Sequence, residues 1–145
     1  MPYPELDTER IELLYVLHPD LHLGQYDSPW INVSGYHKLL FIWTLGDMGQ
    51  ASTLQMRVYE AQDGAGTGWQ VIGKWPTTLT QAGGDGNDIV VMNLRTEEMD
   101  AADNYSYIMI RTLIQAAASN ACCHVFGTAP RYAPVSTAAW TEVVE

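Results

Sequence analysis

Apolar and polar residues alternate with a period of two along most of the chain, which is typical of β-strands that bury one face. Over residues 51–61, Leu54, Met56 and Val58 point to one side, while polar residues point to the other. Residues 36–44 are apolar on both sides in their middle, so we expect a central strand there. These patterns predict a chain built mainly from strands.

Further strands are predicted wherever the same alternation or a run of β-branched residues recurs. They span residues 10–17, 30–33, 69–75, 89–94, 105–115 and 121–126. Turns are predicted where glycine, aspartate, asparagine and other small residues gather, at residues 46–49, 63–68, 82–88 and 116–120. Thr96, followed by Glu97 and Glu98, predicts one short helical turn.

A series of about seven or eight short strands without a long helix favours an all-β fold, an antiparallel β-sandwich of jelly-roll-like type. Parallel sheets would need crossover helices, for which the chain has no room. The length of 145 residues indicates one domain. We expect an N-terminal arm and first strand over residues 1–25, a sandwich core over 26–128 and an extended C-terminal arm over 129–145.

Charge and cysteine usage narrow the possible partners. The formal net charge of −10 repels phosphate, so we expect neither nucleic acid nor an anionic membrane surface as a partner. No apolar run is long enough to span a bilayer, and the polar start of the chain predicts no secretory signal. Cys122 and Cys123 are adjacent and point to opposite faces of a strand, which predicts two free thiols in a reducing cytosol.

Candidate chemical motifs are weak, and each has a plainer interpretation. The glycine- and aspartate-rich loop 83–88 lacks the glutamate that closes a calcium loop, so we interpret it as a turn. His18 and His22 have a helical ligand spacing, but a proline and a glycine beside them disfavour a helix. The acidic residues of 97–103 indicate a solvated loop. No nucleophile elbow or phosphate-binding loop occurs, and we expect no enzyme activity, no cofactor and no metal.

Aromatic residues are the more informative feature. The chain has five tryptophans and eight tyrosines but two phenylalanines, and tryptophan and tyrosine are enriched at protein interfaces. We expect Trp43 in the core. Trp140, in the C-terminal arm, is the strongest candidate for an anchor on a partner protein. Tyr59, on the polar side of its strand, and Tyr3, in the N-terminal arm, are weaker candidates.

A series of sequence blocks runs between Ser34 and Pro134. The most specific are Gly83-Gly84-Asp85-Gly86-Asn87-Asp88 and Pro130-Arg131-Tyr132-Ala133-Pro134, and others are Ser34-Gly35-Tyr36, Leu45-Gly46-Asp47-Met48 and Met56-Arg57-Val58-Tyr59-Glu60-Ala61. The series resembles small virion proteins of tailed bacteriophages, which are often encoded beside the major capsid protein. The resemblance implies a capsid decoration, or cement, protein that binds the outside of the head and stabilises it. It adds Arg131 and Tyr132 to the candidate partner-binding residues.

The resemblance implies the assembled major capsid protein as partner, a homo-oligomer (dimer or trimer), and a place on the capsid exterior after assembly in the host cytoplasm. The acidic charge suits a surface that faces away from packaged DNA, and the arms suit strand addition to neighbouring subunits. Two alternatives stay open. One is a tail tube or head–tail joining protein, and the other is a carbohydrate-binding sandwich with Tyr59 and Trp69 as its aromatic platform.

Overall fold

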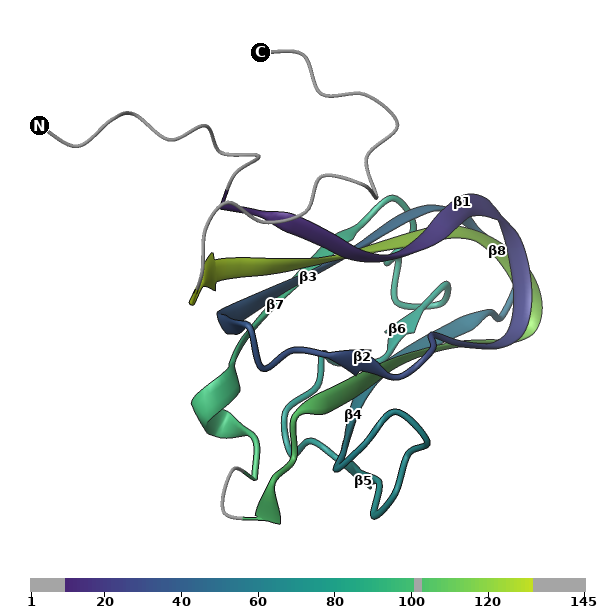
Figure 1. The fold of residues 1–145 in the computed structure, drawn as a ribbon. Helices are drawn as coiled ribbons and strands as arrows, with labels where there is room; N and C mark the ends of the chain where they lie inside the picture. Colours follow the sequence, from purple (N-terminus) through teal and green to yellow (C-terminus); the bar gives the residue numbers. More distant parts are fainter. Residues whose placement is uncertain (1–9, 101–102, 132–145) are drawn as a thin grey trace, which may run out of the picture.

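Two long strands, β1 (Glu12–Asp27) and β8 (Tyr107–Pro130), run antiparallel to each other and frame the fold. The computed structural model describes residues 10–100 and 103–131. In Figure 1 both strands bend over at one end, so each contributes to an upper and a lower layer. The chain is therefore one continuous antiparallel sheet folded into two layers, and the predicted all-β, jelly-roll-like sandwich is confirmed.

The upper layer in Figure 1 is a four-stranded sheet with the order β1–β8–β3–β7. Its two other members are β3 (Tyr36–Met48), which pairs with the second half of β8, and β7 (Ile89–Arg95), which pairs with β3. We call this layer the first sheet. Its central strand β3 matches the prediction made from the apolar residues of 36–44.

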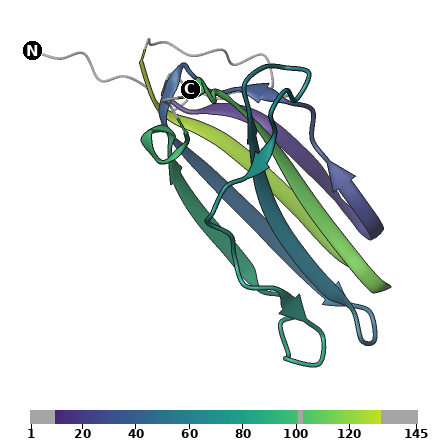
Figure 2. The same cartoon turned by 90° about the horizontal axis from the view of Figure 1, so that it is seen from below.

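The lower layer, called the second sheet, is built on β4 (Thr53–Ala61) and the first half of β8. The outer edge of β4 carries two short strands, β5 (Gln70–Val71) and β6 (Leu79–Thr80), while β2 (Ile31–Asn32) pairs with β8. Figure 2 shows the two layers from below, with their long strands running in similar directions. The predicted hairpin between 51–61 and 69–75 is present, although β5 is shorter than expected.

The predicted turn at residues 116–120 is wrong, because β8 continues through it and does not reverse direction. On β1, His22 pairs with Ser119 and Gly24 pairs with Ile114, so four residues of β8 lie opposite Leu23 alone. Ala116 has a φ of 73°, and this bulge bends β8 from the second sheet into the first. Small residues suit a sharp bend and a turn equally well, which is why the sequence pattern was misleading.

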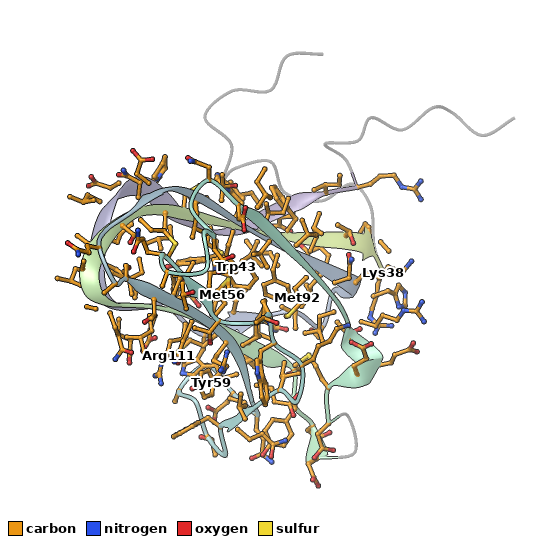
Figure 3. The ribbon with its side chains drawn as sticks, turned by 180° about the vertical axis from the view of Figure 1, so that it is seen from behind. Lys38, Trp43, Met56, Tyr59, Met92 and Arg111 are labelled. Carbon is orange, nitrogen blue, oxygen red and sulfur yellow. The ribbon has the colours of Figure 1, made fainter. Side chains whose placement is uncertain are left out.

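The core fills the space between the two sheets, where alternate residues of each strand meet. Figure 3 shows Trp43 of β3, Met56 of β4 and Met92 of β7 pointing into this space, and none of the three is more than 5% exposed. Trp43 Nε1 donates a hydrogen bond of 3.2 Å to Thr112 Oγ1 on the first half of β8. This bond joins the two layers through their interior.

Two smaller predictions are also confirmed. Thr96–Glu98 forms a short 3-10 turn, η2, whose Glu98 carboxylate accepts the Arg95 backbone N–H at 3.2 Å. Cys122 and Cys123 lie on β8 as free thiols, the first half-buried and the second buried. No helix within residues 10–100 and 103–131 is long and apolar enough to cross a bilayer.

Candidate functional site

The outer side of the second sheet carries a cluster of aromatic and arginine side chains. Arg57 and Tyr59 occupy alternate positions of β4, and Arg111 lies opposite Arg57 on β8. Trp69 and Trp75 flank β5 and complete the cluster. We call these five residues the aromatic–arginine face.

Arg111 holds the centre of the aromatic–arginine face in a fixed geometry. Its guanidinium group lies 4.8 Å from the centre of the Tyr59 ring, and its Nε and Nη2 atoms donate to the two carboxylate oxygens of Asp27 at 2.8 and 3.0 Å. The hydrogen bonds to Asp27 raise the pKa of Arg111 above its ordinary value. Such a bidentate ion pair fixes the plane of the guanidinium group. The guanidinium group in turn holds the Tyr59 ring against it through the cation–π contact. Figure 3 shows Tyr59 and Arg111 beside each other.

The two tryptophans remain largely open to solvent although each has a partner. Trp69 lies edge-on to Tyr59, with ring centres 5.6 Å apart and planes at 69°, and it is 62% exposed. Trp75 is 48% exposed and stacks beneath the guanidinium group of Arg57 at 4.8 Å. Large side chains that are held in place before binding lose little conformational entropy when a partner covers them.

The loop before Trp69 is shaped by local hydrogen bonds. The Asp63 carboxylate accepts the backbone N–H groups of Ala65 and Thr67 at 2.9 and 3.0 Å and the Thr67 hydroxyl at 2.6 Å. The hydroxyl bond from Thr67 is the main cause of a lowered pKa of Asp63. Gly66, with a φ of 81°, sits so close to Trp30 that a Cβ atom would lie 2.6 Å from the indole nitrogen. These contacts constrain the backbone of the predicted turn at 63–68, which immediately precedes Trp69.

The structure brings together two residues that the sequence singled out, Tyr59 and Trp69. Arg131 is exposed at the end of β8, where its Nε donates to the Ser34 carbonyl at 2.8 Å. Tyr3, Tyr132 and Trp140 lie outside the described residues.

Sequence reasoning did not single out Arg57, Arg111 or Trp75. A signal for the two arginines was available. Arg57 shares the polar side of its strand with Tyr59, and Arg111, four residues after Tyr107, lies on the same side of its strand as that tyrosine. The pairing of β4 with β8, which places the arginines opposite each other, was not visible in the sequence.

The other candidate motifs serve local structure. In the loop 83–88, the Asp85 carboxylate accepts the Thr80 backbone N–H at 2.8 Å, which is turn chemistry. His22 lies on the strand β1, with its Nε2 2.8 Å from the His18 carbonyl oxygen. Glu98 supports η2 and lies 3.4 Å from the ammonium group of Lys74. Among the residues that the structure describes, no three His, Cys, Asp or Glu side chains are grouped to hold a metal ion.

No protein-family model matches the chain, and no curated protein matches its sequence. Among solved structures, the chain is similar to a chain of infectious bursal disease virus, Gx strain, at 14% identity and a TM-score of 0.41. A chain of the Gt strain of the same virus matches at 14% identity and a TM-score of 0.39. Each match covers 92% of this chain but 39% of the viral chain. The likeness is distant, and the fold is assigned from the strand pairing described above.

Proposed function

We propose that this protein is a structural component of a tailed-phage virion, where it binds the outer surface of the capsid lattice and stabilises the head. The observation that carries the proposal is the aromatic–arginine face. Tryptophan, tyrosine and arginine dominate the binding energy of protein interfaces. Here they form one group on the outer side of the second sheet, with Trp69 and Trp75 exposed, in a chain whose net charge is −10. The sequence resemblance to small phage virion proteins is the reason for proposing a virion as the place of binding.

The composition of the face favours a protein partner over a reaction. Its residues are large and are held by Asp27 and by one another. Arg57, Tyr59 and Arg111 are half-buried, and the exposed Trp69 and Trp75 offer open contact area. Repetition of such contacts over a lattice gives a high total affinity even if each contact is weak. The acidic remainder of the surface then faces away from the shell and keeps the particle soluble.

Binding to shells that lack this protein tests the proposal. Purified protein should bind such shells and raise their heat resistance, and Trp69→Ala should weaken binding by about tenfold or more, the cost of a moderate interface hot spot. Leu23→Ala is the matched control, because Leu23 is 54% exposed but lies at the bend of β1, outside the aromatic–arginine face. No binding by the wild type, or equal binding by both variants, would contradict the proposal.

The number of copies in the particle separates this role from the first alternative. A decoration protein should be present in a fixed ratio to the capsid subunits, whereas a tail tube or joining protein should be present in tens to a few hundred copies. Gel densitometry of purified particles measures this ratio.

A carbohydrate-binding module remains the second candidate, favoured by the 62% exposure of Trp69 beside Tyr59. The 69° angle between the two rings means that they do not form one flat stacking platform. Sugar binding would therefore use the open side of Trp69 alone. A glycan array with no bound sugar would remove this candidate.

A further inference from the structure

The strand β7 forms an outer edge of the first sheet. Among the described strands it pairs with β3 alone, without any shift in register. Residues 89–94 contain no charged side chain and no proline, and Ile89 and Val91 are 65% and 54% exposed. An edge of this kind is a ready template for another strand.

The other described edges carry features that prevent such pairing. β1 has three register shifts against β8, and bulges of this type twist an edge away from a would-be partner. β2, β5 and β6 have two residues each, which is too short for a stable ladder. β7 therefore differs from the other described edges, and a partner for it is the simplest physical reason.

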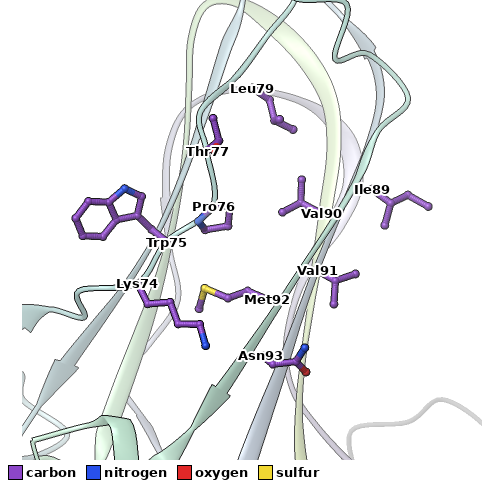
Figure 4. Close-up of a pocket in the computed structure, with 10 residues that line it drawn as sticks. All are labelled: Lys74, Trp75, Pro76, Thr77, Leu79, Ile89, Val90, Val91, Met92 and Asn93. Atoms are coloured by element: carbon purple, nitrogen blue, oxygen red, sulfur yellow. The ribbon is translucent and has the colours of Figure 1, made fainter.

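The approach to β7 is also open. A groove of about 590 Å³ separates β7 from the segment 74–79, which belongs to the side of the second sheet. Figure 4 shows Val90 and Met92 pointing into this groove, while Ile89 and Val91 point away from it. Ile89, Val91 and Asn93 line the groove as well, so the edge of β7 borders this open space.

The hydrogen-bond pattern identifies which groups of β7 are available. Leu45 N–H donates to the Asp88 carbonyl at 2.9 Å, so in an antiparallel ladder every second residue after Asp88 also faces β3. The alternate residues Ile89, Val91 and Asn93 direct their N–H and C=O groups outward. The next outward N–H, that of Arg95, already binds the Glu98 carboxylate.

We propose that β7 pairs antiparallel with β7 of a second copy, about a two-fold axis that passes through Val91. In this register Val91 lies opposite Val91 and Ile89 opposite Asn93, so all the outward groups are used. A shift by one pair in either direction would require the occupied Arg95 N–H or leave Asn93 unpaired. The resulting homodimer goes beyond the proposed capsid binding and does not depend on it.

Charge at the two ends of β7 favours a second copy as the partner. Asp47, Asp85 and Asp88 lie where β7 begins. Lys38, Arg95 and Arg131 lie where it ends, around a hollow of about 440 Å³. Glu97 also lines this hollow and lies 3.5 Å from the Arg95 guanidinium group, so the hollow keeps an excess of positive charge. Antiparallel pairing brings the acidic end of each copy to the basic end of the other. This local attraction opposes the repulsion between two chains that each carry a net charge of −10.

Opposite charges placed at the axis test the register directly. Analytical ultracentrifugation of the full chain should show a dimer, and Val91→Lys or Val91→Glu should each weaken it by at least about tenfold, because like charges then face each other. An equimolar mixture of the two variants should recover the dimer. The matched control is Val71→Lys, on the short strand β5, where Val71 is 43% exposed. A monomeric wild type, an undiminished Val91→Lys dimer or a mixture that stays monomeric would each overturn the proposal.

A cross-link gives a second measurement that does not depend on the charged variants folding well. Residues opposite each other at such a position have Cα atoms about 5.5 Å apart, within the range that a disulfide spans. Oxidised Val91→Cys protein should therefore run as a covalent dimer, while the wild type, with Cys122 and Cys123 unchanged, should not. Absence of the covalent dimer would count against the two-fold axis.

Discussion

Thr112→Val should destabilise the protein by removing the acceptor of the hydrogen bond that joins the two sheets. Trp43 and Thr112 are 0% and 1% exposed, and Trp43 Nε1 donates to Thr112 Oγ1 at 3.2 Å. Valine has nearly the shape of threonine, so the substitution creates no cavity. It leaves the indole N–H buried without a partner, which costs about 1–3 kcal/mol.

That cost is measurable in a chain of this size. In a domain of roughly 150 residues each 1 kcal/mol lowers Tm by about 2–4 °C, so the variant should melt roughly 2–12 °C below the wild type. Urea unfolding followed by tryptophan fluorescence gives the free energy of unfolding, and the midpoint should fall without a change in slope.

A double-mutant cycle isolates the hydrogen bond from other effects of the substitutions. Trp43→Phe removes the donor, and the combined variant removes both partners. If the bond acts as described, the two single changes should be non-additive, with a coupling free energy of about 1 kcal/mol. A Thr112→Val variant within about 0.3 kcal/mol of the wild type, together with zero coupling, would refute the reasoning.

Three further predictions follow from backbone geometry and titration. Ala116→Val places a β-branched residue at a φ of 73° and should lower the free energy of unfolding by about 1–3 kcal/mol, measured by urea unfolding. Gly127→Ala puts a Cβ atom 2.6 Å from the buried Tyr36 ring and should lower Tm by an amount that corresponds to about 1–3 kcal/mol. The lowered pKa of Asp63 means that its contribution to stability is present above its ordinary pKa of 3.8 and is lost as the pH falls toward the folded-state value. Asp63→Ala should therefore flatten the fall of Tm with pH in the acidic range, and an unchanged profile would contradict this.

The sequence alone determined much of the fold because strand formation has a local signature. The alternation around Leu54, Met56 and Val58 identified β4, and all three residues are buried. The apolar middle of 36–44 identified β3 as central, and β3 lies between β8 and β7 with one face buried and the other half-buried. Even the pairing of Tyr59 with Trp69 followed from a short hairpin, in which distance along the chain limits distance in space.

Tertiary structure decided what depends on contacts between distant parts of the chain. The alanine-rich segment from Ala116 predicts a turn by its sequence. It is a bend within one strand because β8 pairs with β4 before it and with β3 after it. The alignment of Arg57 with Arg111 is likewise a matter of register between strands about fifty residues apart. The edge position of β7 was likewise decided by tertiary structure. β7 is an edge strand because, among the described residues, only one strand pairs with it. No local sequence pattern shows which strands will be neighbours.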